Sequence, residues 1–131
     1  PYTEPAEAKE FVAQTDVDFL AIAVGTIHGI YKGEPKIDMD RLSEIRQVVD
    51  VPLVLHGTSG VPDEQVREAI KRGICKVNYA TDLRIAYTKG ARANLEDDKV
   101  IDPKKYGEAG MKEVYALVAD KIKVVGSDNK A

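Results

Sequence analysis

Leu53-Val54-Leu55-His56-Gly57-Thr58-Ser59-Gly60 is the stretch of sequence that decides the fold. Its first three residues are apolar without alternation, which predicts a strand buried on both faces, as in parallel sheets. After the glycine-rich loop come Pro62, Asp63 and Glu64, which predict a helix start because acidic side chains favour the positive end of the helix dipole. The stretch is therefore typical of one strand–loop–helix unit of an α/β protein.

The same unit recurs on both sides of this stretch. Upstream, residues 19–24 form a second apolar run, and a helix opens at Asp38 or Asp40. Downstream, residues 76–79 form a third strand that leads into a helix from about Asp82. Such alternation predicts parallel strands joined by helical crossovers.

Two further helices flank these three units. The first is capped by Thr3, and the last is a long helix capped by Asp102. Cys75, at the start of the third strand, is predicted to be a small buried apolar residue. The apolar spacing predicts that the inward-facing helix residues are Ala8, Phe11, Val12, Leu42, Ile45, Val48, Val49, Val66, Ala69, Ile70, Val114, Leu117, Val118 and Ile122.

The repeated unit is compatible with two architectures, the doubly wound sheet and the eight-stranded barrel. The Gly-x-Gly-x-x-Gly dinucleotide signature is absent, which weakens the first. Three units cannot close a barrel, so the barrel interpretation requires earlier units, and a chain that starts at Pro1 agrees with this. We therefore expect residues 1–131 to be the C-terminal portion of one (β/α)8 TIM-barrel domain, with the N-terminal part absent. It would contain three parallel strands, their helices and a C-terminal helix.

The composition is that of an ordinary soluble protein. Of the 131 residues, 44% are apolar and 31% are charged, and the formal net charge is −3. There is no dense basic run and no apolar stretch of the roughly 20 residues that cross a bilayer, so neither a nucleic-acid nor a membrane partner is predicted. The single cysteine, Cys75, cannot form an internal disulfide, which favours a reducing cytoplasm.

Polar residues gather where each predicted strand ends. The segments are 25–29, 56–60 and 78–82. Because parallel strands end on one face, the three segments should converge there, and they carry the only two histidines, His28 and His56. One histidine alone is usually tied to nearby backbone, but two at adjacent strand ends favour a zinc site. A catalytic zinc uses three protein ligands, so this pair is incomplete; Asp82 could ligate but suits a helix start better.

The remaining polar residues of these segments have two interpretations each. Residues 57–60 either cradle a phosphate with backbone N–H groups or form a plain strand-to-helix turn. Asn78 either orients a substrate or caps a helix, and Thr81 either donates to a phosphate or serves as an N-cap. Lys32 follows the first histidine and is either a point charge for a phosphate or a solvated side chain.

Three ordered motifs resemble those of the class II aldolases. They are Gly25-Thr26-Ile27-His28-Gly29-Ile30-Tyr31-Lys32-Gly33, Pro52-Leu53-Val54-Leu55-His56-Gly57-Thr58-Ser59-Gly60 and Lys76-Val77-Asn78-Tyr79-Ala80-Thr81-Asp82. The likeness runs along nearly the whole chain and is greatest to the bacterial tagatose-bisphosphate and fructose-bisphosphate aldolases. It implies a zinc-containing barrel whose last three strands and closing helices are present in this chain.

The resemblance also implies residue roles. In the family, zinc chelates dihydroxyacetone phosphate and stabilises the enediolate formed when the carbon–carbon bond breaks. His28 and His56 match two zinc ligands, and Asn78 is the candidate for orienting the enediolate. A monovalent cation, Na⁺ or K⁺, is expected near the phosphate. The residues that match the family's dihydroxyacetone phosphate-binding segments are Gly29, Gly57, Thr58, Ser59, Asn78, Tyr79, Ala80 and Thr81.

The chain also departs from the family pattern. The third zinc histidine, the acidic residue that handles the proton of the cleaved alcohol, and a glutamate-bearing loop lie in the half that is absent. Tyr79 stands where many relatives have a smaller apolar residue. No residue of this chain is therefore assigned as the acid or base.

The leading hypothesis is a cytoplasmic lyase that splits a tagatose or fructose 1,6-bisphosphate into dihydroxyacetone phosphate and glyceraldehyde 3-phosphate. Ser59 and Thr81 are its predicted phosphate contacts, and the family resemblance implies a homodimer or homotetramer. The alternatives are a non-catalytic sugar-phosphate-binding half-barrel that associates with itself, and a metal-free phosphate-binding barrel enzyme.

Overall fold

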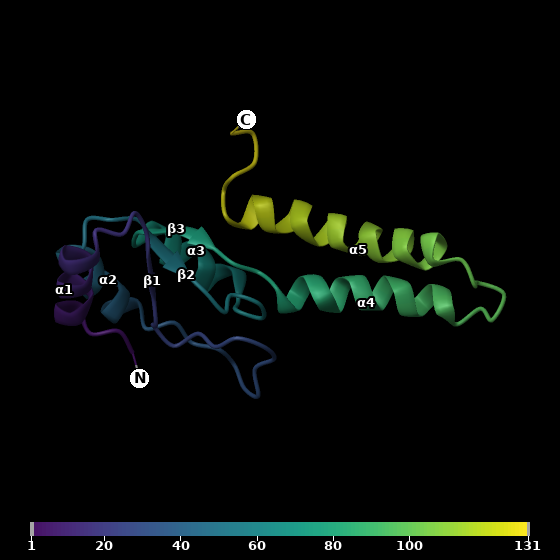
Figure 1. Cartoon of the computed structure of the whole chain (residues 1–131), viewed down its shortest axis with the longest axis horizontal. Coiled ribbons are helices and arrows are strands. Elements are labelled where there is room, and N and C mark those ends of the chain that lie inside the picture. Colours follow the sequence, from purple (N-terminus) through teal and green to yellow (C-terminus); the bar gives the residue numbers. More distant parts are fainter. Residues whose placement is uncertain (1, 131) are drawn as a thin grey trace. The chain divides into compact units, whose positions relative to one another are not determined.

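The computed structural model describes residues 2–130, which form two compact units, residues 2–79 and residues 80–130. The first unit contains, in chain order, α1 (Pro5–Thr15), β1 (Leu20–Ile22), α2 (Met39–Val48), β2 (Leu53–Leu55), α3 (Asp63–Lys71) and β3 (Ile74–Val77). The second contains α4 (Thr81–Leu95) and α5 (Pro103–Val124) (Figure 1). The predicted α/β class, with three strand–helix units and an extra C-terminal helix, is confirmed.

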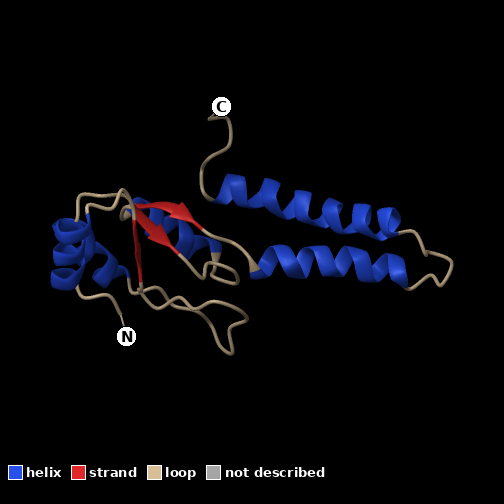
Figure 2. Ribbon diagram, viewed as in Figure 1, coloured by secondary structure: helices blue, strands red, loops and turns tan. Residues whose placement is uncertain are grey.

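The sheet has the order β1-β2-β3, and both pairings are parallel (Figure 2). Leu20 and Ile22 of β1 pair with Leu53 and Leu55 of β2, and all four side chains are buried. Ala21 lies between the first two and is exposed, because successive side chains of a strand point to opposite faces. One face of the sheet therefore carries most of the core of this unit, while on the other face the central Val54 is buried as well.

Helices α2 and α3 supply the other side of this core. Leu42 and Ile45 of α2 and Val66 of α3 are fully buried. The predicted N-cap Asp38 is confirmed, since its carboxylate accepts a hydrogen bond from the Arg41 N–H at 2.9 Å. This bond satisfies one of the free N–H groups in the first turn of α2.

The third strand differs from the prediction. It begins at Ile74, two residues earlier than expected, and Cys75 within it is exposed instead of buried. Ile74 pairs with Leu53, whereas Lys76 pairs with Val54, so Cys75 is the extra residue of a bulge. The bulge lets Ile74 fill the core, and this change of register is not visible in the local sequence.

The prediction that Thr3 caps the first helix is wrong. Glu4 occupies the N-cap of α1 and makes no side-chain cap hydrogen bond. Thr3 instead bonds to the backbone beyond β1: its Oγ1 accepts from the Ala23 N–H at 2.9 Å, and its own N–H donates to the Ala23 carbonyl at 2.8 Å. The Thr3 hydroxyl thus bonds to Ala23, twenty residues away, and not to the N–H groups at the start of α1.

The helical spacing overestimates how much of each helix is buried. Four residues that were predicted to face inward are between 39% and 49% exposed, namely Phe11, Val48, Val118 and Ile122. Regular spacing indicates an apolar stripe, but the width that is covered depends on how many neighbours the helix has. Within the second unit, α5 has only α4 as a neighbour, so one narrow stripe is covered.

Glycines allow α4 and α5 to pack closely in the second unit. Gly90 of α4 and Gly110 of α5 are buried, and the Tyr87 ring lies over Gly110. Asp102 caps α5 as predicted, since its carboxylate accepts from the Lys104 N–H at 2.9 Å. None of the helices between residues 2 and 130 combines the length and the apolar character needed to span a membrane.

Replacing Gly90 by alanine is expected to destabilise the second unit by about 1–3 kcal/mol. Alanine normally favours a helix interior over glycine by about 1 kcal/mol. Here, however, a Cβ would lie 2.7 Å from the Ala109 carbonyl carbon and 3.0 Å from Glu113 Cγ, so the helices must move apart. Gly107→Ala is the matched control, because its Cβ would meet only Tyr87 Oη at 3.5 Å. Denaturant unfolding should show opposite signs for the two variants; equal stabilisation by both would contradict this account of the packing.

Candidate metal and substrate site

The two histidines lie side by side at the carboxyl ends of the strands. His28 belongs to the β1–α2 loop and His56 follows β2 directly. Their ring centroids are 5.7 Å apart with an interplanar angle of 83°. Both residues are exposed. The loop and the strand end thus bring together two residues that are 28 positions apart in the sequence.

This geometry fits two ligands of one zinc ion. With zinc–nitrogen distances of about 2.0–2.1 Å and a tetrahedral angle, the centroids of two bound imidazoles lie roughly 5 to 6 Å apart. The observed separation falls in that range, and exposed rings are accessible to an ion. Within residues 2–130, no three or more His, Cys, Asp or Glu side chains gather closely enough to hold a metal. The pair by itself offers two nitrogen donors, one fewer than the three protein ligands of a catalytic zinc.

The hydroxyls of Thr26 and Tyr31, which were not among the predicted site residues, connect the two loops that carry the histidines. Thr26 Oγ1 donates to the His56 carbonyl at 2.7 Å. Tyr31 Oη accepts from the Ile27 N–H at 2.9 Å and donates to the Gly57 carbonyl at 2.9 Å. Their only sequence signal was proximity to His28, because the partner carbonyls belong to another loop.

Residues 57–60 form a compact turn ahead of α3. Gly57 and Gly60 have φ angles of 65° and 80°, a region that glycine adopts without strain. Thr58 is fully buried, its hydroxyl donates to the Leu55 carbonyl at 3.2 Å, and its carbonyl accepts from the Val61 N–H at 3.0 Å. Ser59 is 6% exposed. The turn is thus stabilised from within, and phosphate binding by it stays a prediction.

Asn78 lies at the end of β3, beyond the exposed Lys76. Its N–H donates to the Leu55 carbonyl at 3.2 Å, which extends the pairing with β2 by one step. Lys76 Nζ donates to Asn78 Oδ1 at 3.2 Å. With Oδ1 turned towards Lys76, the Asn78 amide nitrogen is directed away from it. Lys76 was not among the predicted site residues.

The other predicted residues have the following positions. Gly29, with a φ of 103°, and the exposed Lys32 lie on the β1–α2 loop with His28. Tyr79 is the last residue of the first unit, while Ala80 and Thr81 begin the second. Ala80 is the N-cap of α4 and makes no side-chain cap bond, so the alternative that Asn78 or Thr81 caps this helix is wrong.

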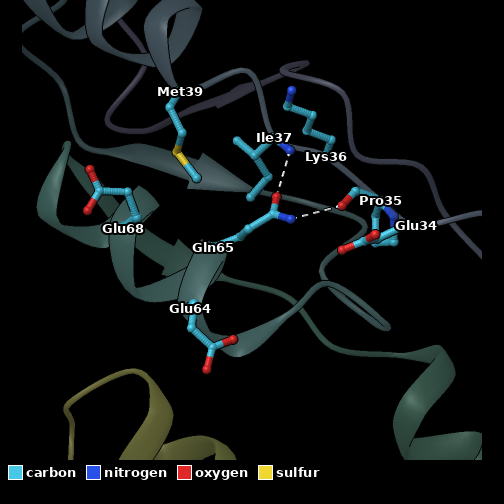
Figure 3. Close-up of a pocket in the computed structure, with 8 residues that line it drawn as sticks. All are labelled: Glu34, Pro35, Lys36, Ile37, Met39, Glu64, Gln65 and Glu68. Carbon is cyan, nitrogen blue, oxygen red and sulfur yellow. Dashed lines mark hydrogen bonds between the residues drawn. The ribbon is translucent and has the colours of Figure 1, made fainter.

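A separate pocket of about 510 Å³ lies between the β1–α2 loop and α3 (Figure 3). It is lined by Glu34, Pro35, Lys36, Ile37, Met39, Glu64, Gln65 and Glu68. Figure 3 shows Gln65 reaching from α3 to the loop, where its Nε2 donates to the Pro35 carbonyl at 3.0 Å and its Oε1 accepts from the Ile37 N–H at 2.9 Å. Its lining carries three carboxylates and one ammonium, and although Glu68 is paired with Arg72 at 2.7 Å, the remaining charges do not attract a phosphorylated sugar.

Comparison with known proteins agrees with the motifs. Residues 1–130 match the family model of class-II fructose-bisphosphate aldolase. The YdjI aldolase from Escherichia coli K12 is 38% identical, with a TM-score of 0.85 over 99% of this chain and 48% of that chain. A proposed fructose-1,6-biphosphate aldolase from Coccidioides immitis is 32% identical, with a TM-score of 0.88 over 98% of this chain and 45% of that chain.

The fructose-bisphosphate aldolase of Campylobacter jejuni shares the fold at 20% identity, with a TM-score of 0.84 over 99% of this chain and 47% of that chain. This chain therefore spans about half the length of each of the three solved structures. Its parallel sheet and helices correspond to half of the aldolase barrel, as the resemblance of the three motifs implied. The chain belongs to the class II fructose-bisphosphate aldolase family and corresponds to a C-terminal part of that fold.

Proposed function

We propose that this chain supplies the C-terminal half of a zinc-dependent aldolase. The reaction would split a ketose 1,6-bisphosphate, tagatose or fructose, into dihydroxyacetone phosphate and glyceraldehyde 3-phosphate. One observation carries the proposal. The only two histidines of this aldolase-family chain lie at the carboxyl ends of its strands, with their ring centroids 5.7 Å apart. That is the face on which barrel enzymes place their active sites.

His28 and His56 would hold the zinc through neutral imidazole nitrogens. A zinc ion bound there would supply Lewis-acid chemistry, stabilising negative charge on substrate oxygens. Asn78 would donate from its amide nitrogen to an oxygen of the substrate on which charge develops. Lys76 supports this role because its bond to Oδ1 favours the amide rotamer in which the nitrogen points away from Lys76. The third ligand and the group that moves the proton would come from outside this chain.

The phosphate of dihydroxyacetone phosphate would bind along the loops that follow the strands. Gly57, Thr58 and Ser59 would offer backbone N–H groups, and Thr58 can offer only its backbone because its hydroxyl already donates to Leu55. The Ser59 and Thr81 hydroxyls and the Lys32 ammonium would complete the contacts. Gly29, Tyr79 and Ala80 would belong to the segments that hold dihydroxyacetone phosphate. A Na⁺ or K⁺ ion would lie beside the phosphate.

The cellular setting is part of the same proposal. A cytoplasmic protein is supported by the single Cys75, which has no partner for an internal disulfide. We expect a homodimer or homotetramer, in keeping with the family. The only other partner that we expect for the protein is the small sugar bisphosphate.

The test is cleavage of tagatose and fructose 1,6-bisphosphates by the complete polypeptide that contains this chain. A chelator should remove more than about nine tenths of the turnover, and added zinc should restore it, because the metal would stabilise the negative charge that develops on the substrate oxygens. The faster substrate identifies the natural one. Turnover that is indifferent to chelation would contradict the zinc role and favour a metal-free phosphate-binding enzyme.

A second candidate is a sugar-phosphate-binding half-barrel that associates with itself. It is favoured by the sheet, in which β1 and β3 are both edge strands and the exposed residues Ala21 and Lys76 flank the buried Val54. Unpaired strand edges favour association. Sedimentation of the 131-residue chain as a compact monomer would count against this candidate.

A further inference from the structure

We propose that the hydroxyls of Tyr31 and Thr26 set the separation of His28 and His56, and that these two side chains thereby control the zinc affinity of the pair. The inference rests on the proposed function, because it assumes that the two histidines bind one metal ion. It adds two positioning residues that do not themselves touch the metal or the substrate.

The two sets of hydrogen bonds made by Thr26 and Tyr31 are called tethers here, and the first acts on the backbone of His56. Thr26 stands two positions before His28, and its Oγ1 donates to the carbonyl of His56 at 2.7 Å. A short hydrogen bond therefore connects the loop that carries one histidine to the peptide unit of the other. Because a side chain follows its own backbone, this bond limits the drift of His56 relative to His28.

The second tether uses one oxygen for two bonds. Tyr31 stands three positions after His28, and its Oη accepts from the Ile27 N–H and donates to the Gly57 carbonyl, both at 2.9 Å. Ile27 precedes His28 and Gly57 follows His56, so the hydroxyl joins the immediate neighbours of both ligands. Tyr31 is half-buried, and its ring faces Gly60, where an added Cβ would lie 3.5 Å from Cδ2.

These tethers matter because the loop that carries His28 is long. It runs from residue 23 to residue 38 without regular structure. Its far end is held by the Asp38 N–H bond to the Val24 carbonyl at 2.8 Å and by the two Gln65 bonds to residues 35 and 37. Near His28, Gly29 has open space around it and a φ of 103°, which gives the backbone freedom.

Metal sites are sensitive to small displacements, since ligand distances must hold to within about 0.2 Å. Ordering a free loop around an ion would also cost conformational entropy at the moment of binding. Hydroxyls that order the loop beforehand remove that cost. Loss of supporting groups behind metal ligands typically weakens metal binding by about 10–100-fold.

The experiment compares zinc affinities of matched variants of the complete polypeptide, by competition with a chromophoric chelator. Tyr31→Phe and Thr26→Val each remove one hydroxyl at nearly constant shape, and each should weaken zinc binding by about tenfold or more. Thr26→Ser keeps the hydroxyl and removes only the methyl group, so it should bind zinc as the wild type does. Tyr115→Phe is the matched control, since Tyr115 is 78% exposed on α5. Co²⁺ loaded in place of zinc should show an altered visible spectrum in the two weakened variants only.

A metal-free readout tests the tether itself. In Tyr31→Phe the Ile27 amide loses its acceptor and should exchange with deuterium faster than in Tyr115→Phe. Zinc affinities equal to wild type in both Tyr31→Phe and Thr26→Val would overturn the inference, as would unchanged Ile27 exchange. If Tyr31→Phe fails to fold, the Thr26 pair decides: valine and serine variants that behave alike overturn it. A wild-type protein that binds no zinc overturns the proposed function together with the inference, so the two failures are distinguishable.

Discussion

Replacing His56 by alanine is expected to abolish stoichiometric zinc binding by the complete polypeptide. A catalytic zinc is held by three protein ligands, and this substitution removes one of the two proposed ligands of this chain, whose ring centroids are 5.7 Å apart. Affinity should fall by more than the roughly 100-fold that loss of a supporting group can cause. Zinc content after dialysis measures the loss, and His28→Ala should match it.

Cys75→Ser is the control for this prediction. The thiol is exposed, and a thiolate binds zinc well, so it is the side chain of this chain best able to bind the metal adventitiously. The serine variant should keep the zinc content of the wild type. Zinc that follows Cys75 and is indifferent to both histidines would contradict the assignment of the metal site.

Replacing Gly57 by alanine is expected to destabilise the first unit by roughly 2 to 5 kcal/mol and to weaken zinc binding. The residue has a φ of 65°, where a Cβ is strained. In addition, the Cβ would lie 2.5 Å from the Ile27 carbonyl oxygen and 2.7 Å from its carbonyl carbon, which are backbone atoms that cannot rotate away. The loop that carries His28 must therefore move away from His56.

Substitutions at two other glycines distinguish the cost of backbone strain from the cost of a steric clash with the added Cβ. Gly29 also has a positive φ, but nothing lies within 4 Å of an added Cβ, so Gly29→Ala should cost only the strain, about 1–2 kcal/mol. Gly33 has open space and no positive φ, so Gly33→Ala should leave stability nearly unchanged. Urea unfolding gives the free energy of unfolding of each of the three variants, which should be lowest for Gly57→Ala and highest for Gly33→Ala. A Gly57→Ala protein as stable as Gly29→Ala would show that the loops carrying His28 and His56 do not pack as described.

Much of the fold could be predicted because it depends on local patterns. The run Leu53–Leu55 is buried throughout, as its unbroken apolar character indicated, and Asp38 and Asp102 cap the helices they were predicted to cap. Capping requires only a side chain and an N–H group two or three positions away. The convergence of His28 and His56 followed from one topological rule, that parallel strands end on the same face.

The failures share a different cause. Thr3 was predicted to cap a helix, but its partner is Ala23, and Cys75 was predicted to be buried, but it is the exposed extra residue of a bulge. The four apolar residues that proved partly exposed show that spacing defines a stripe and not the surface that covers it. In each case the outcome depends on a segment that is distant in the sequence.

The sequence by itself determined the elements, their parallel order and the residue types at the strand ends, because apolar runs, caps and glycines act over a few neighbouring positions. Only the tertiary structure decided how the strand ends fit together. The Thr26 and Tyr31 bonds to the His56 loop and the close approach of Gly57 to Ile27 arise there. These contacts join atoms that are close only when the loops after β1 and β2 lie side by side, which no local pattern of residues specifies.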